Sequence, residues 1–213
     1  MKVKEVFVDE LQLIKSQEIK NFVLECFNKF CPDYFWTVSC SSTGKYHPAI
    51  SLGEGGLVRH TKLAIWWGEE LLKTWPMLPN TAHDEVIAAL LLHDILKRGK
   101  TENDLDTFET HAKAISSHGI YAAKQITELY GPQLNENQRL KRVVTAIRDH
   151  MGKWTGGSTR STKDIVHNTK EGHVVCITVH LADYCASRKV DDKVLELAGV
   201  KDESVGDLVH SSD

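Results

Sequence analysis

The sequence predicts an all-α, single-domain bundle of about six to eight helices. Apolar residues recur at intervals of three and four along most of the chain, which is the period of an amphipathic helix. All five prolines lie between or beyond the periodic segments. The length of 213 residues suffices for one buried core, and no change in composition marks a domain boundary.

Seven helices are predicted, in chain order over residues 10–30, 57–73, 81–97, 108–129, 136–151, 171–188 and 191–198. In the first, an apolar stripe ends just before Pro32, and the second ends before Pro76. The third begins with a capping Thr81 and ends before Gly99. The fourth stops at Gly131–Pro132.

The fifth predicted helix continues the apolar period as far as residue 151. The sixth is rich in Val, Ile and Thr, but its length favours a buried helix over a strand. A short seventh helix precedes a frayed tail over 200–213, and residues 1–36 form an N-terminal helical extension. Two long connections remain, 37–56 and 152–163. The first leads into His60, and long loops in compact domains are often functional.

Composition excludes several classes of protein. The net charge of −3 lacks the basic excess of proteins that grip long nucleic acid, which is therefore not an expected partner. Five cysteines without a C-x-x-C pair argue against a disulfide framework or zinc knuckle. No secretory signal or membrane-length apolar run is present, so we expect a cytoplasmic protein without a membrane partner. The sequence does not indicate an oligomeric state.

The adjacent residues His93 and Asp94 end the most apolar run of the chain. Burying an imidazole and a carboxylate without partners would cost several kcal/mol. One reading is a core histidine beside a capping aspartate. The other is a metal site, which is favoured because further histidines, and an aspartate near the end, also lie in apolar helical segments. Those residues are His60, His118, His150 and Asp183.

Three ordered motifs resemble the HD-domain metal-dependent phosphohydrolases over about residues 55–190. They are Gly55-Gly-Leu-Val-Arg-His60-Thr, Leu91-Leu-His93-Asp94-Ile-Leu-Lys97 and Leu181-Ala-Asp183-Tyr. The resemblance implies an all-α bundle of the HD-domain type. It also implies a first metal held by four residues, which are His60, His93, Asp94 and Asp183.

His118 and His150 resemble the extra ligands of a two-metal subgroup with the pattern H…HD…H…H…D. The resemblance implies that Asp94 bridges to a second metal held by these two histidines. His111, seven residues earlier on a similar helix face, is the alternative to His118, which is preferred because small residues follow it as in that subgroup. His150 could instead be a surface histidine at a helix C-terminus.

Imidazole and carboxylate donors suit one or two divalent ions of Fe, Mn, Zn, Co or Ni, with Mg²⁺ as a further ion in the substrate complex. Such ions activate water, and no convincing nucleophilic side chain is present. The resemblance implies Asp94 and Lys97 as the catalytic residues, the latter one helical turn after His93, where a lysine recurs in the family. Its alternative is a solvated lysine at a helix end. Weaker candidates for substrate binding are Lys45, His47, Trp154 and Arg188.

These assignments predict a hydrolase that cleaves a phosphate ester or anhydride of a small phosphorylated substrate, a nucleotide. The alternatives are a 3′–5′ exonuclease or phosphodiesterase on short nucleic acid, and a non-catalytic HD module that senses a nucleotide. HD-domain exoribonucleases carry a stretch similar to Lys45–His47 ahead of the first histidine, but we do not expect their separate nucleic-acid-binding domain here.

Overall fold

The computed structural model describes residues 2–74, 80–99, 117–152 and 170–200. This part of the chain contains nine α-helices, six of seven residues or more, and no strand, which confirms the predicted all-α class. The helices are α1 (Lys2–Val6), α2 (Val8–Leu13), α3 (Gln17–Phe30), α4 (Gly56–Leu72), α5 (Asn80–Leu92), α7 (His118–Glu136), α8 (Gln138–Asp149), α9 (Lys170–Ala186) and α10 (Asp192–Leu197). No described helix is both long and apolar enough to cross a membrane.

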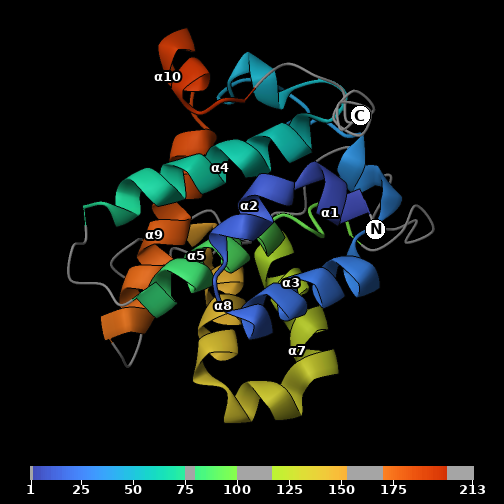
Figure 1. Cartoon of the computed structure of the whole chain (residues 1–213). Coiled ribbons are helices and arrows are strands. Elements are labelled where there is room, and N and C mark those ends of the chain that lie inside the picture. The colour runs from blue at the N-terminus through green and yellow to red at the C-terminus, as the bar shows by residue number, and fades with distance from the viewer. Residues whose placement is uncertain (1, 75–79, 100–116, 153–169, 201–213) are drawn as a thin grey trace.

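Helix α5 is the centre of the bundle. It contacts α3, α4, α8 and α9, and Figure 1 shows it enclosed by these neighbours. Every residue from Val86 to Leu92 is fully buried, because this helix is apolar on all sides. Two long pairs, α4 with α9 and α7 with α8, pack around it. The end of α5 therefore points into the interior, where four other helices can supply side chains.

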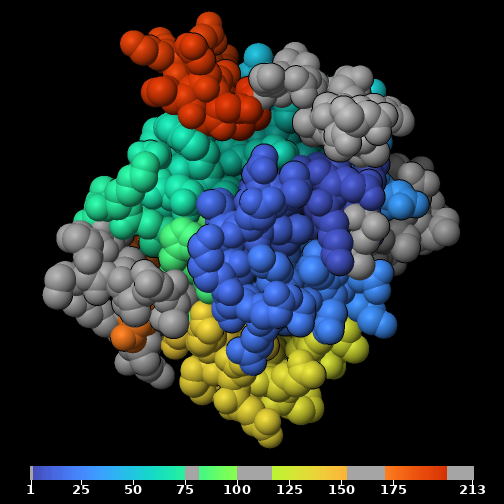
Figure 2. All heavy atoms as spheres, viewed as in Figure 1, coloured from blue at the N-terminus to red at the C-terminus, as the bar shows by residue number. Residues whose placement is uncertain are grey.

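The N-terminal helices cover one face of this bundle, as the blue surface in Figure 2 shows. Their side chains join a short 3₁₀ helix, η1 (Asp33–Trp36), in an aromatic cluster. Phe7, Phe27, Phe35 and Trp36 form it, with ring centroids 5.1 to 6.3 Å apart. Aromatic pairs at this spacing add to the energy of burial. The extension is thus part of the packed structure.

The predicted helix over 10–30 is wrong in one respect, because the chain leaves the helical conformation at residues 14–16. Ser16 caps α3 by accepting a hydrogen bond from the Ile19 N–H. The buried Asp84 carboxylate accepts two more, from the N–H groups of Lys15 at 2.9 Å and Ser16 at 2.8 Å. A tertiary partner 68 residues away therefore creates the break, and local periodicity carries no sign of it.

Asp84→Ala is expected to lower the free energy of unfolding by about 2–4 kcal/mol, since two part-buried N–H groups lose their acceptor and Arg139 loses a partner at 3.5 Å. Urea unfolding would measure it. Asp84→Asn keeps one acceptor in the same shape and should lose about half as much. An unchanged free energy of unfolding in both variants would show that Asp84 does not stabilise the non-helical stretch at residues 14–16.

The fourth predicted helix extends further along the chain than the sequence predicts. The sequence predicts that it stops at Gly131–Pro132, but α7 continues to Glu136 with Pro132 inside it. Residues 127–129 are exposed, so solvent can satisfy the carbonyl that proline leaves without a donor. Asn137 makes the real break, because its side chain caps α8. The start of this predicted helix, 108–116, lies outside the described residues.

The expected loop over 37–56 folds back on itself. It contains a second 3₁₀ helix, η2 (Ala49–Ser51), and backbone hydrogen bonds join Cys40 N–H to Ser51 O and Gly55 N–H to Thr37 O. The buried Arg59 donates to two of its carbonyls, at Ile50 and Leu52. Because Arg59 precedes His60 in α4, this segment is fixed directly beside a predicted metal ligand.

Candidate metal centre

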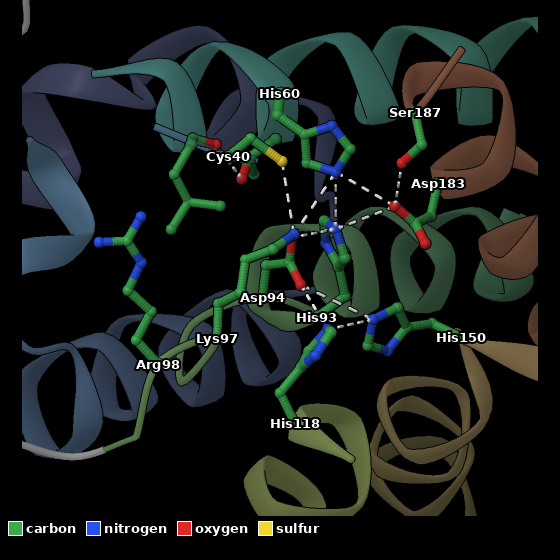
Figure 3. A network of polar contacts seen from close by, with 12 residues as sticks. Cys40, His60, His93, Asp94, Lys97, Arg98, His118, His150, Asp183 and Ser187 are labelled. Carbon is green, nitrogen blue, oxygen red and sulfur yellow. Dashed lines mark hydrogen bonds and ion pairs between the residues drawn. The ribbon is translucent and has the colours of Figure 1, made fainter. Parts of the chain in front are cut away.

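The six predicted metal ligands converge at the end of α5. His60 comes from the second turn of α4, His118 begins α7, His150 ends α8, and Asp183 lies in α9. His93 and Asp94 follow directly after α5. Figure 3 shows these side chains directed toward one another from separate elements. All are buried except Asp183, whose side chain is 13% exposed.

His93 and Asp94 lie in a tight turn, so the predicted helix over 81–97 is five residues too long. Hydrogen bonds between residues three apart, from Ile95 N–H to Leu92 O and from Lys97 N–H to Asp94 O, wind this turn more tightly than an α-helix. Tyr34 of η1 fixes its end, because its hydroxyl donates to Gly99 O at 2.6 Å and accepts from Arg98 N–H at 2.9 Å.

Two of the histidines are oriented by the backbone. Nδ1 of His93 lies 2.6 Å from the Leu90 carbonyl, and Nδ1 of His150 lies 2.7 Å from that of Ile147. A carbonyl only accepts hydrogen bonds, so each Nδ1 is the donor and each Nε2 faces the site. This is the arrangement by which proteins orient metal-binding imidazoles.

One group of donors comprises His60, His93 and Asp183. Oδ1 of Asp183 lies 3.1 Å from Nε2 of His60 and 3.7 Å from Nε2 of His93, and the two nitrogens are 3.4 Å apart. A second group comprises Asp94, His118 and His150. Oδ1 of Asp94 lies 2.7 Å from Nε2 of His118 and 3.7 Å from Nε2 of His150, with 3.0 Å between the nitrogens.

Asp94 connects the two groups through its two oxygens. While Oδ1 faces His118 and His150, Oδ2 lies 3.4 Å from Nε2 of His93 and 3.6 Å from Nε2 of His60. Lys97 Nζ lies 2.5 Å from the same Oδ2. The carboxylate therefore has histidine pairs on both sides and a cation beside it.

A family model described as HD domain matches residues 57–188. The chain belongs to the HD domain family. This family is generally hydrolytic and lies in a superfamily of metal-dependent phosphohydrolases, which agrees with the resemblance found in the motifs. Neither a curated protein nor a solved structure matches this chain.

The donors of this HD domain fit divalent metal ions. The Nε2 lone pairs of His93 and His150 are directed into the buried site, because both Nδ1 atoms donate to carbonyls. Each Nε2 faces a second imidazole nitrogen, at 3.4 and 3.0 Å, and an oxygen of Asp94. Buried acceptors normally have partners, and cations between these donors would supply them. Mixed nitrogen and oxygen donors suit first-row transition ions.

Electrostatics keep both carboxylates ionised. Burial raises the pKa of Asp94, but Lys97 and His93 outweigh it and hold the pKa well below the usual range. Burial also raises the pKa of Asp183, but the hydrogen bond with His60 and the charges of His93 and His150 together outweigh it and lower the pKa. Burial lowers the pKa of His150, which leaves its imidazole neutral, as a metal ligand requires.

Cys40 is a neighbour of the HD-domain site that the sequence analysis missed. Its thiol Sγ lies 3.4 Å from Lys97 Nζ, and it forms a third possible metal group with His47 and His60. Burial raises the pKa of Cys40, but His60 and Lys97 outweigh it and lower the pKa well below its usual value. No motif predicts this contact, because Cys40 and Lys97 are 57 residues apart.

Two of the four predicted substrate-binding residues line a cavity in the structure. His47 and Arg188 line a cavity of about 600 Å³ beside Asp183. Lys45 is exposed, with Nζ 5.0 Å from the ring of Tyr46. Trp154 lies outside the described residues, as does His111, the alternative ligand. The cavity is also lined by residues that were not predicted, which are Tyr46, Met151, His180, Tyr184 and Ser187.

Two of these additional residues contact predicted ligands. Ser187 Oγ donates to Oδ1 of Asp183 at 3.4 Å, and His180 Nδ1 donates to the His150 carbonyl at 2.6 Å. Ser187 is four residues after Asp183 and so on the same helix face, a spacing that could have identified it. The contact of His180 follows only from the packing of α8 on α9.

Proposed function

We propose that this protein is a phosphohydrolase that uses metal-activated water to cleave a phosphate ester or anhydride of a small, nucleotide-type substrate. One observation carries the proposal: the two oxygens of Asp94 face two separate groups of histidines. That arrangement supports a two-metal site. His60, His93, Asp94 and Asp183 would hold one ion, and Asp94, His118 and His150 the other.

When bound, divalent ions polarise a phosphoryl oxygen and lower the pKa of water, which supplies the nucleophile. The protein's own side chains supply a positive charge beside the candidate metal ligands. Lys97 is a buried cation whose pKa burial lowers, while Asp94 and Cys40 outweigh that effect and raise it. Because Lys97 stays charged, it can offset negative charge on the phosphate in the transition state. Asp94 holds it at that position.

A small substrate agrees with the shape of the site. The cavity beside Asp183 has a volume of about 600 Å³, within the range of roughly 300–1,000 Å³ that is typical for small-ligand pockets. Cationic and aromatic side chains line it, and these bind phosphates and bases. Because the overall charge is −3, we do not propose long nucleic acid as a partner.

A substrate screen with product identification tests the proposal. The Mn²⁺-loaded protein would be incubated with nucleoside mono-, di- and triphosphates, dinucleoside polyphosphates, cyclic dinucleotides and a short single-stranded oligonucleotide. We expect turnover of at least one small nucleotide, lost after chelation and restored by Mn²⁺. Turnover of the oligonucleotide alone, weakening steeply with salt, would favour the exonuclease. Bound metal without any turnover would contradict an enzyme and favour a nucleotide-sensing module.

A further inference from the structure

The cavity beside Asp183 reaches the end of α9, where Arg188 lines it. Asp183, Tyr184, Ser187 and Arg188 form one wall, and Tyr46 and His47 of the segment before α4 form another. Arg188 lies five residues after Asp183, just beyond the end of α9. At about 1.5 Å of rise per residue, its backbone is roughly 7 Å along the chain from that ligand.

Arg188 is stacked on two tyrosine rings. Its guanidinium carbon lies 4.2 Å from the ring centroid of Tyr184 and 5.3 Å from that of Tyr46. The two rings come from different parts of the fold, one from α9 and one from the segment 37–55, so they restrain the guanidinium between them. Cation–π contacts of this kind restrain the guanidinium before a ligand arrives.

A guanidinium held in this way suits a phosphate. Its parallel N–H groups match two phosphate oxygens, and charge-assisted bonds of this kind are about twice as strong as neutral ones. Lys45 adds a second positive charge near the same tyrosine, with Nζ 5.0 Å from the ring of Tyr46. The cavity is therefore lined both by a candidate metal ligand, Asp183, and by a cation, Arg188.

We infer that Arg188, clamped by Tyr46 and Tyr184, binds a phosphate of the substrate other than the one that is hydrolysed. The substrate class is then a nucleotide with two or more phosphates, rather than a monophosphate. This inference rests on the proposed function, because it takes the attacked phosphate to lie at the metal groups. The metal groups alone would accept a substrate with one phosphate, whereas a site at Arg188 requires a second phosphate.

Steady-state kinetics of the Mn²⁺-loaded full chain test the clamp. For substrates with two or more phosphates, Arg188→Met should raise KM about 10- to 100-fold. For p-nitrophenyl phosphate, or bis(p-nitrophenyl) phosphate if the enzyme is a diesterase, kcat/KM should change less than about threefold, since no second anion is present. Arg188→Lys keeps the charge without the fork and should lie between. Equal losses on both substrate types, or none on either, would overturn the inference.

Variants of Tyr184 test whether its ring face holds Arg188, or whether any change in packing at this position weakens substrate binding. Tyr184→Leu should raise KM for the substrates with several phosphates, and Tyr184→Phe, which keeps the ring face, should raise it much less. Lys124→Gln, on the exposed surface of α7, controls for loss of one positive charge. Melting curves would confirm that each variant is folded.

Direct binding keeps the inference testable if the proposed function fails. Calorimetry on the Mn²⁺-loaded protein would compare nucleoside diphosphates with the matching monophosphates. We expect the wild type to prefer the diphosphate by at least about tenfold, and Arg188→Met to lose that preference. No preference in the wild type, or an unchanged one in the variant, would overturn the clamp. Absence of turnover alone would contradict only the proposed hydrolysis.

Discussion

Asp94→Asn should lower kcat/KM by roughly 10³-fold or more and reduce the metal content to well under one ion per chain. The substituted side chain has the same shape but no charge, and it presents an N–H₂ group to one of the two histidine pairs. Both metal groups lose their shared carboxylate. Metal ions supply several kcal/mol of transition-state stabilisation, and about 1.36 kcal/mol corresponds to a factor of ten in rate.

Metal analysis after gel filtration and kinetics on the best substrate would measure both effects. Asp192→Asn is the matched control, because that residue is exposed in the first turn of α10. In Asp94→Asn the amide oxygen can still accept a hydrogen bond from Lys97, so the variant should remain folded. Near-normal activity with a full complement of metal would exclude Asp94 as the bridging ligand.

Helical periodicity predicted most helices, because the apolar stretches of the sequence coincide with the buried parts of the helices. The stripe from Ile19 to Phe27 is buried in α3, and the apolar run from Val86 to Leu92 is the central helix. The errors lie at helix ends, where single contacts decide the outcome. Asp84 breaks the first predicted helix, and Tyr34 holds the turn after α5. Both contacts join residues that are far apart in sequence, by 69 and 65 positions.

The proximity of the six candidate ligands was predictable, because they lie on ordered motifs with recognisable flanks. The structure brings them together and shows how Asp94 faces both groups, which a list of residues could not show. Cys40 was not predicted, since no spacing relates it to the motifs. Tyr184 follows Asp183 in the third motif and Tyr46 lies between Lys45 and His47, but the sequence does not indicate that both rings contact Arg188. The positions of Cys40 and Tyr46 depend on how the segment 37–55 folds against α4, and Arg59 fixes that segment through hydrogen bonds to two of its carbonyls.

This segment precedes the HD-domain match, which begins at residue 57. It nevertheless supplies Cys40 beside Lys97 and His47 beside His60, whose ring centroids are 5.7 Å apart. Burial lowers the pKa of His60, yet Cys40 and Asp183 outweigh it and raise the pKa to about 10, so a metal ion that binds this imidazole must displace a proton from it. The surroundings of the metal groups are therefore partly built by residues that the family match does not include.

Removal of metal should lower the melting temperature by roughly 10 °C. A ligand at about 1,000 times its Kd stabilises a protein by approximately 4 kcal/mol, and each kcal/mol shifts Tm by about 2–4 °C at this size. The effect arises because the ligands come from α4, α7, α8, α9 and the turn after α5, so bound ions join most of the bundle. Calorimetric melts after chelation, and after addition of Mn²⁺, would measure it.

The same melts distinguish two metal groups from one. His118→Ala removes a ligand from the second group only, so Mn²⁺ should still raise its Tm, by about half the wild-type shift. Asp94→Asn affects both groups and should show almost no shift. His83→Ala serves as a histidine control, because His83 pairs with Glu69 on the outer side of α5. A full wild-type shift in His118→Ala would mean that one ion, held by His60, His93 and Asp183, accounts for the stabilisation.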